Sequence, residues 1–264
     1  MINLDKTNNT ISLLNGDCME MFKKIPDESI DLIITDPPYN LGNFMKARQT
    51  NLKKMRSNFF GDAGWDNDSY EEWINHMDNF IKESQRVLKK NGSMIIFMST
   101  IKVESIINIA EKNGLYYKTT GIWHKTNPMP RNMNLHFINS NECWIYFTNK
   151  SKTGTFNNNG KAIHDFFESS VTPSSEKKHG KHPTQKPENL IESFVKILSN
   201  KNDTILDCFM GSGTTGVVAK RLERNFIGIE LNSEYFNIAK KRINDVDNEN
   251  YRMDIEELTN WCIR

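Results

Sequence analysis

The sequence has few cysteines, almost no net charge and no long apolar run. Its four cysteines form no Cys-x-x-Cys pair and show no spacing typical of a structural zinc site, so we expect reduced thiols and no metal: Cys18, Cys143, Cys208 and Cys262. The formal net charge of +1 argues against a polycation that holds its partner by bulk charge alone. Without 18 consecutive apolar residues or an apolar signal core, we expect a cytoplasmic protein with no membrane contact.

The length of 264 residues and the apolar fraction of 37% suit one α/β domain spanning residues 1–264. A continuous apolar run at residues 30–35 is typical of a strand buried on both faces of a parallel sheet. It is followed by an amphipathic helix and a second apolar strand, which together predict a parallel strand, helix, strand unit. In total we expect seven strands, near residues 11–14, 30–35, 93–98, 116–124, 142–148, 204–207 and 226–229.

The amphipathic helix of this unit has the clearest boundaries in the sequence. Ser69 and Glu72 form a capping box at its start, and we expect Gly92 to end it. Residues 151–180, by contrast, are polar and show little apolar periodicity. A stretch of this length is functional or disordered rather than an ordinary connection.

A glycine-rich turn lies between the strand at residues 204–207 and the next helix. Gly211, Gly213 and Gly216 would let the backbone approach a ligand, and Glu230, at the end of the following strand, could accept hydrogen bonds from ribose hydroxyls. A turn that serves packing alone is the alternative. Because only 48 residues follow Gly216, the other strands must come from earlier in the chain. We therefore expect a C-terminal cofactor half and an N-terminal half that face one crevice.

The N-terminal half contributes an Asp-Pro-Pro-Tyr turn directly after the strand at residues 30–35. The prolines have no N–H, so the carbonyl oxygens near Asp36 have no competing donor from Pro37 or Pro38. Together with the Asp36 carboxylate and the Tyr39 ring, they match a planar exocyclic amine, which has two N–H donors and a π face. The alternative is a proline-rich turn with a capping aspartate.

These features resemble the S-adenosylmethionine-dependent DNA amino-methyltransferases of the beta class. The similarity rests on three segments in family order: residues 36–39 (DPPY), 182–187 (HPTQKP) and 207–214 (DCFMGSGT). Cys208 departs from the family, which usually has proline there, and the C-terminal extension of some members is absent. The resemblance implies a Rossmann-like, seven-stranded methyltransferase sheet, circularly permuted, with a target-recognition insertion.

The resemblance also implies which residues bind S-adenosylmethionine. It places Phe209, Gly211, Ser212 and Gly213 around the methionine part, and Glu230 at the ribose hydroxyls. Asp17 would lie near the adenine amine, and Thr184 and Lys186 near the cofactor carboxylate. The complete set of expected cofactor-binding residues is Asp17, Cys18, Asp36, Thr184, Lys186, Asp207, Phe209, Gly211, Ser212, Gly213, Thr214 and Glu230.

For catalysis, we expect Asp36, Pro37, Pro38 and Tyr39 to act on N6 of an adenine that has left the duplex. The Asp36 carboxylate and the Pro37 carbonyl would accept the two N6 hydrogens while Tyr39 stacks on the base. Asp36 favours adenine because the cytosine-N4 enzymes of the same class more often have serine there, so cytosine-N4 methylation is the alternative. A different class, the NAD-dependent Rossmann oxidoreductases, would explain the glycine turn but not the Asp36 turn.

Two basic regions explain how a near-neutral chain could bind DNA. Residues 41–60 carry a net charge of +5 and residues 118–188 also +5, while residues 245–257 carry −5. We expect DNA contacts from a basic loop at residues 41–68 and a target-recognition region at residues 129–180. The candidate DNA-binding residues are Lys46, Arg48, Lys53, Lys54, Arg56, Arg131, Asn132 and His136, with Lys150, Lys152, Lys161, Lys177, Lys178 and Lys181 suited to phosphates. The resemblance further suggests a bacterial or phage restriction-modification enzyme at the nucleoid, with a cognate endonuclease and a homodimer as further partners.

Overall fold

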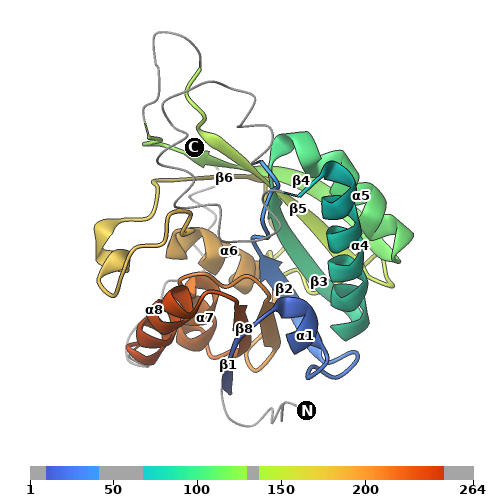
Figure 1. Cartoon of the computed structure of the whole chain (residues 1–264). Helices are drawn as coiled ribbons and strands as arrows, with labels where there is room; N and C mark the ends of the chain where they lie inside the picture. The colour runs from blue at the N-terminus through green and yellow to red at the C-terminus, as the bar shows by residue number, and fades with distance from the viewer. Residues whose placement is uncertain (1–9, 42–67, 130–136, 247–264) are drawn as a thin grey trace.

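One mixed β-sheet runs through the computed structural model, which describes residues 10–41, 68–129 and 137–246 (Figure 1). Within these ranges the sheet has eight strands in the order β1-β8-β7-β2-β3-β5-β4-β6. The strands are β1 (Ile11–Asn15), β2 (Ile30–Thr35), β3 (Leu88–Met98), β4 (Leu115–Lys125), β5 (Asn141–Asn149), β6 (Phe166–Ser169), β7 (Thr204–Asp207) and β8 (Asn225–Glu230). The α/β architecture expected from the sequence is therefore present, with eight strands in the described residues where seven were expected.

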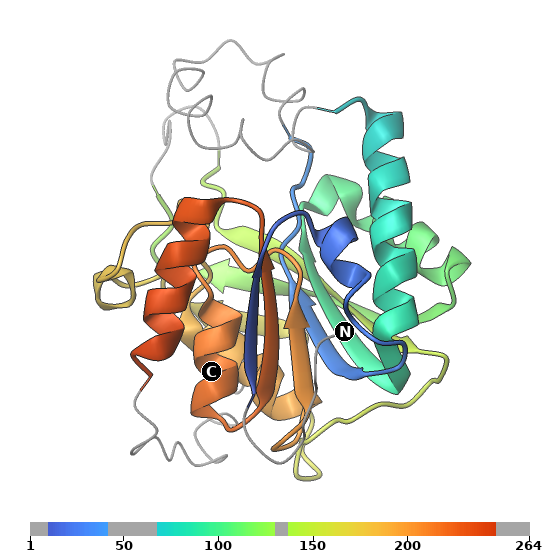
Figure 2. The same cartoon turned by 60° about the horizontal axis from the view of Figure 1, so that its bottom comes forward.

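Helices cover both faces of the sheet (Figure 2). One face carries α1 (Cys18–Phe22), α4 (Tyr70–Val87) and α5 (Val103–Lys112), and the other carries α6 (Glu188–Leu198), α7 (Thr214–Arg221) and α8 (Ser233–Asn244). Two short 3-10 helices, η2 (Thr100–Lys102) and η3 (Ser174–Lys177), complete the elements. No helix among the described residues combines the length and the apolar character needed to cross a bilayer.

The sheet separates two hydrophobic cores because alternate side chains of each strand point to opposite faces. In β2, Ile33 packs into the core beneath α1, α4 and α5, whereas Leu32 and Ile34 pack into the core beneath α6, α7 and α8. These residues are at most 1% exposed. Burial on both faces explains why β2 reads as a continuous apolar run in the sequence.

Strand direction determines which loops meet. β1, β8, β7, β2 and β3 are mutually parallel, so all five end at one edge of the sheet, which we call the carboxyl edge. β5 is antiparallel to β3 and β4 is antiparallel to β5. As a result, β4 ends at the carboxyl edge and β5 begins there, while β5 finishes at the opposite edge.

One additional strand and the end of α4 differ from the sequence prediction. The eighth strand, β6, lies inside residues 151–180 and has only four residues, too few to show a periodic pattern. The capping box of Ser69 and Glu72 is confirmed, but α4 ends at Val87 and not at Gly92. β3 already pairs with β2 at Leu88, and the residues that follow bulge out before pairing resumes at Ser93.

Candidate active site

The Asp-Pro-Pro-Tyr turn follows β2 directly at the carboxyl edge. Tyr39 donates its hydroxyl hydrogen to Asp36 Oδ1 at 2.5 Å, so the ring and the carboxylate are held together. Burial, followed by the negative charges of Asp36 and Glu142, raises the pKa of Tyr39 well above its ordinary value. Tyr39 therefore stays protonated and continues to donate to Asp36.

The second oxygen of Asp36 binds a lysine from a distant part of the chain. Lys186 Nζ contacts Asp36 Oδ2 and lies 3.2 Å from Glu142 Oε2. The Lys186 side chain is 8% exposed. Burial alone would lower the pKa of Lys186, but the two carboxylates outweigh burial and raise it to about 12. The structure thus brings together Asp36 and Lys186, which the sequence predicted for separate roles.

The neighbouring elements fix the backbone around this turn. Trp73, on α4, donates its indole N–H to the Pro38 carbonyl at 3.2 Å. Within the described residues, no hydrogen bond is made to the Pro37 carbonyl. Pro38 is therefore engaged by the fold, while the Pro37 carbonyl is the acceptor left for a ligand.

Two segments leave the carboxyl edge near the turn, residues 41–68 and 126–139, and a hydrogen bond joins the two ends of each. The side chain of Asn40 donates to the Ser69 carbonyl at 3.4 Å. Lys125 donates its backbone N–H to the Ser140 carbonyl at 2.7 Å. Residues 41–68 and 126–139 are thus each closed at their base.

The glycine turn between β7 and α7 has the conformation that glycine permits. Gly211 has φ 51° and Gly213 has φ 79°, both in the left-handed region. A Cβ on Gly213 would lie 2.8 Å from the Cβ of Ala239 on α8. The turn therefore requires glycine for both its dihedral angles and its packing, and α7 begins at Thr214, earlier than the sequence indicated.

Asp207 is the buried anchor of this turn. Its Oδ1 accepts from Thr35 Oγ1 and from the Phe209 N–H, both at 3.1 Å, and its Oδ2 accepts from Thr215 Oγ1 at 2.7 Å. Burial raises the pKa of Asp207 to about 7 despite these bonds. Because Thr35 immediately precedes Asp36, Asp207 links the glycine turn to the Asp-Pro-Pro-Tyr turn.

Glu230, at the end of β8, connects the glycine turn to its neighbours on the carboxyl edge. Its Oε2 accepts from the Gly211 N–H at 2.9 Å and its Oε1 from the Asn232 N–H at 2.8 Å. Its backbone carbonyl accepts from the N–H of Gly16, which precedes Asp17. Asp17 caps α1 through its side chain, and Cys18 is buried at 4% exposure. Asp17, Gly211 and Glu230 are thus connected along one edge.

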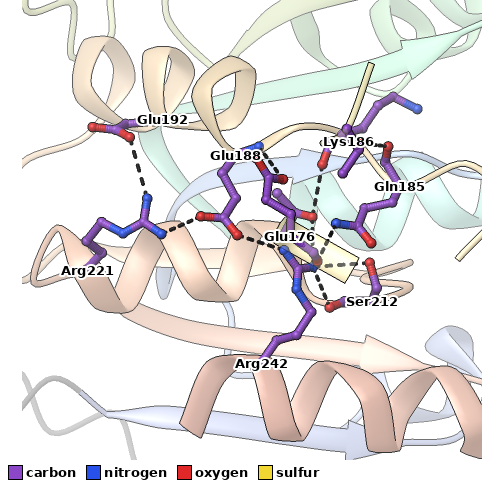
Figure 3. A network of polar contacts seen from close by, with 10 residues as sticks. Glu176, Gln185, Lys186, Glu188, Glu192, Ser212, Arg221 and Arg242 are labelled. Atoms are coloured by element: carbon purple, nitrogen blue, oxygen red, sulfur yellow. Dashed lines mark hydrogen bonds and ion pairs between the residues drawn. The ribbon is translucent and has the colours of Figure 1, made fainter. Parts of the chain in front are cut away.

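An arginine of α8 holds the backbone of the glycine turn (Figure 3). Arg242 Nη1 donates to the Ser212 carbonyl at 2.8 Å and to Thr214 Oγ1 at 3.1 Å, and its Nη2 donates to Glu188 Oε1 at 2.8 Å. Glu188 also pairs with Arg221. Arg242 is 5% exposed, so the cation is buried and fully engaged.

The chain before α6 is attached to the same network. Gln185 donates from its side chain to the Glu176 carbonyl at 3.1 Å, and Thr214 Oγ1 donates to the Lys186 carbonyl at 3.1 Å. Burial, followed by repulsion from Glu188, raises the pKa of Glu176 to about 7. Thr184, predicted to lie near the cofactor, directly precedes Gln185 and is exposed.

The predicted DNA-contact residues fall largely outside the described ranges. This applies to Lys46, Arg48, Lys53, Lys54, Arg56, Arg131, Asn132 and His136. Lys150 pairs at 2.9 Å with Glu28, which precedes β2, and the backbone carbonyl of Lys152 accepts a hydrogen bond from Lys118 Nζ near the start of β4. These two lysines therefore lie at the edge of the sheet opposite Asp36.

Several residues of the site were not predicted as functional. Glu142 and Lys125 have no local sequence signal, because their strands pair only in three dimensions. Trp73 is a buried residue of α4, and its sequence position alone indicates a core residue. Arg242 offered one usable signal. It lies beside Ala239 and Ile243 on the buried side of α8, where a charged residue needs a specific partner.

Comparisons with known proteins show the family to which the chain belongs. A family model described as DNA methylase matches residues 30–241. The chain is 39% identical over 242 residues to the type II methyltransferase M2.LlaDCHI of Lactococcus lactis subsp. cremoris, covering 88% of each chain. It is 36% identical over 250 residues to the type II methyltransferase M.HinfI of Haemophilus influenzae, covering 89% of this chain and 68% of that one.

Solved structures show the same fold. The crystal structure of an M1.HpyAVI-SAM complex matches with a TM-score of 0.66 at 31% identity, covering 89% of this chain and 100% of that one. PvuII DNA methyltransferase, a cytosine-N4-specific enzyme, matches with a TM-score of 0.72 at 22% identity, covering 96% of this chain and 92% of that one. The second likeness concerns the fold alone.

Proposed function

The chain belongs to the DNA methylase family, and on this premise we propose that it transfers a methyl group from S-adenosylmethionine to N6 of adenine in a specific DNA sequence. The observation that carries the proposal is the acceptor set at the carboxyl edge: the Asp36 carboxylate, the Pro37 carbonyl and the Tyr39 ring lie together beside the glycine turn. Relatives named type II methyltransferases and the SAM complex of M1.HpyAVI support it.

The residues at the glycine turn fit S-adenosylmethionine. Positive φ angles at Gly211 and Gly213 give this turn a backbone path that other residues rarely adopt, at the carboxyl edge where ligands of parallel sheets bind. The Glu230 carboxylate lies at the next strand end, where it suits ribose hydroxyls, and Asp17 lies beyond it on the same edge. When bound, the cofactor supplies an electrophilic methyl group on a sulfonium.

The turn after β2 handles the target base. The lone pair of an adenine amino nitrogen is delocalised into the ring, so the nitrogen is a poor nucleophile. Asp36 and the Pro37 carbonyl accept its two hydrogens and favour a tetrahedral nitrogen whose lone pair points toward the methyl group. Tyr39 stacks on the base, and such stacking is worth about 1 to 3 kcal/mol, which helps to offset removal of the base from the duplex.

Asp36 also indicates which base is methylated. We infer adenine because an aspartate begins the turn, and we keep cytosine-N4 methylation as the alternative within the same family. We do not retain an NAD-dependent oxidoreductase, because that hypothesis accounts for the glycine turn alone. DNA contacts are proposed for residues 41–68 and 129–180, because Asn40 and Lys125, which precede these regions, lie at the carboxyl edge with Asp36. Lys150 and Lys152 lie at the opposite edge and are not part of this proposal. A cytoplasmic setting, a cognate endonuclease and a homodimer complete the proposal.

Base-resolved sequencing of DNA tests the proposal. DNA from cells that express the protein should contain N6-methyladenine within one sequence motif, and cells that express Asp36→Ala should lack it. Purified protein with labelled S-adenosylmethionine, followed by nucleoside analysis, separates the bases. N4-methylcytosine would establish the alternative, and no modified base with the wild-type protein would overturn the proposal.

A further inference from the structure

Glu142 belongs to a mostly buried cluster of four charged groups that extends from the Asp-Pro-Pro-Tyr turn, called here the target-base turn after its proposed role, into the antiparallel part of the sheet. Its Oε2 lies 3.2 Å from Lys186 Nζ, and its Oε1 is bound by Lys125 Nζ. Lys186 in turn binds Asp36. The side chains of Lys186, Lys125 and Glu142 are 8%, 15% and 24% exposed. Two carboxylates therefore alternate with two ammonium groups, and the cluster has no net charge.

The strand arrangement explains why Glu142 reaches the site. β5 is antiparallel to β3 and pairs Cys143 with Met98, so Glu142 stands just beyond the end of β3 at the carboxyl edge. Lys125 is the last residue of β4, beside the start of β5. A parallel strand in the place of β5 would have put its first residues at the opposite edge, so the reversal of β5 delivers this carboxylate to Asp36.

Aromatic rings hold both lysines in place. Lys186 Nζ lies 4.9 Å from the centroid of the Phe97 ring, and Lys125 Nζ lies 5.0 Å from that of Trp123. Burial alone would raise the pKa of Glu142, but Lys186 and Lys125 outweigh burial and lower it. Glu142 is therefore a carboxylate at neutral pH, and removal of its charge would leave the remaining three groups with a net charge of +1.

We propose that Glu142 is a positioning residue for methyl transfer, which holds Lys186 against Asp36 and keeps the cluster electrically neutral next to a cationic methyl donor. The proposal rests on the function proposed above. The sulfonium must come close to the nitrogen that Asp36 binds, since reacting atoms meet at about 3 to 3.5 Å. A net positive charge in this buried cluster would repel the sulfonium, because charges interact strongly where water is excluded.

The test compares binding of S-adenosylmethionine with binding of S-adenosylhomocysteine by calorimetry. The two ligands share the adenosine and the amino-acid carboxylate, so a changed contact to either part affects both equally. Only the first has the sulfonium charge. For Glu142→Gln we expect the dissociation constant of S-adenosylmethionine to rise about tenfold and that of S-adenosylhomocysteine to change less than about twofold. Glu168→Gln, on the neighbouring strand β6 and 53% exposed, is the matched control and should change neither.

Removal of a positive charge from the cluster, at Lys125, should have the opposite effect on S-adenosylmethionine binding. Lys125→Gln leaves a net charge of −1, so it should tighten S-adenosylmethionine relative to S-adenosylhomocysteine. The double variant Lys125→Gln with Glu142→Gln should return the ratio of the two dissociation constants to that of the wild type. A merely structural role predicts additive damage in the double variant, and this outcome would overturn the proposal. If Glu142→Gln alone does not fold, the ratio of the two dissociation constants in Lys125→Gln is compared with the ratio in the double variant, and this comparison decides between the two roles.

The kinetic readout separates this proposal from the proposed function. With both substrates saturating, Glu142→Gln should slow single-turnover methyl transfer about tenfold or more. If the wild type methylates DNA and Glu142→Gln matches it in rate and in ligand ratio, the role of Glu142 is refuted while the function stands. If the wild type neither binds S-adenosylmethionine nor methylates DNA, the function itself fails.

Discussion

The indole N–H of Trp73 donates to the carbonyl oxygen of Pro38 across 3.2 Å. Trp73 is fully buried in α4, while Pro38 lies in the turn that carries Asp36. The longest helix of the described chain thus fixes the plane of one peptide in the target-base turn. This sets the direction of the preceding carbonyl, that of Pro37, because the prolines leave the intervening backbone little freedom.

Trp73→Phe should therefore slow catalysis without weakening cofactor binding. The variant loses one hydrogen bond to a buried carbonyl, worth about 1 kcal/mol, and leaves the Pro38 peptide free to reorient. We expect the rate of methyl transfer at saturating substrates to fall about tenfold. Stopped reactions with labelled S-adenosylmethionine measure this rate, and calorimetry measures cofactor affinity.

The control for Trp73→Phe is Tyr70→Phe, one helical turn before Trp73 on α4, which removes the hydrogen bond between Tyr70 and Ser105. It should retain the wild-type rate. Equal rates for Trp73→Phe and the wild type, with only a lower melting temperature for the variant, would show that the indole N–H serves folding alone.

Arg242→Lys should weaken cofactor binding. A lysine ammonium cannot reproduce the planar fork that reaches Ser212, Thr214 and Glu188 together, so the glycine turn loses its support. We expect the dissociation constant of S-adenosylmethionine to rise about tenfold in calorimetry. Arg221→Lys is the matched control, because Arg221 forms ion pairs with Glu188 and Glu192 on α6. The same loss in both variants would contradict a specific role of Arg242.

Two glycines with similar φ angles allow the stability lost through backbone strain to be separated from the stability lost through packing. Gly213→Ala combines a positive φ of 79° with a clash against Ala239, whereas Gly160→Ala has φ 73° and open space around its Cβ. Strain alone costs about 1 to 2 kcal/mol. We expect Gly160→Ala to lose only this amount in urea unfolding and to keep cofactor binding. Gly213→Ala should lose more stability and bind S-adenosylmethionine at least about tenfold more weakly, and matching losses would refute the packing argument.

His182 should make stability depend on pH. Burial, followed by the charges of Lys186 and Arg242, lowers its pKa to about 4 from an ordinary value of about 6.5. Between these values the unfolded chain binds a proton that the folded chain does not. The contribution of a neutral His182 is therefore complete above pH 6.5 and is lost as the pH falls toward 4, by about 2 kcal/mol between pH 7 and pH 5.

Urea unfolding at these two pH values checks this prediction. His182→Gln should lose about 2 kcal/mol less than the wild type on going from pH 7 to pH 5. His164→Gln, at an exposed position, should follow the wild type. If His182→Gln shows the same pH dependence as the wild type, the buried neutral imidazole is not responsible.

The sequence predicted those parts of the fold and the site that depend on neighbouring residues. The capping box at Ser69 and the apolar run of β2 are local patterns, and both are confirmed. The glycine turn and the Asp-Pro-Pro-Tyr turn are short motifs, and the structure places them on one edge, joined through Asp207 and Thr35. Their roles toward a ligand remain predictions.

What the sequence did not reveal depends on pairing between distant residues. Glu142 reaches Lys186, the partner of Asp36, only because β5 is reversed, and nothing near Glu142 in the sequence indicates that reversal. The end of α4 at Val87 follows from the bulged pairing of β3 with β2, which overrides the glycine signal at residue 92. Lysine was expected to serve the cofactor alone, yet Lys186 also neutralises Asp36.

Hydrogen bonds that join the ends of two segments allow these segments to vary without a change in the fold. A hydrogen bond between Asn40 and Ser69 joins the ends of residues 41–68. A second hydrogen bond, between Lys125 and Ser140, joins the ends of residues 126–139. Once the base of a loop is fixed, each doubling of its length costs only about 0.6 kcal/mol. Segments of different length and sequence can therefore replace one another without shifting any strand. On the function proposed above, the target sequence can then change while the turn at Asp36 is inherited unchanged.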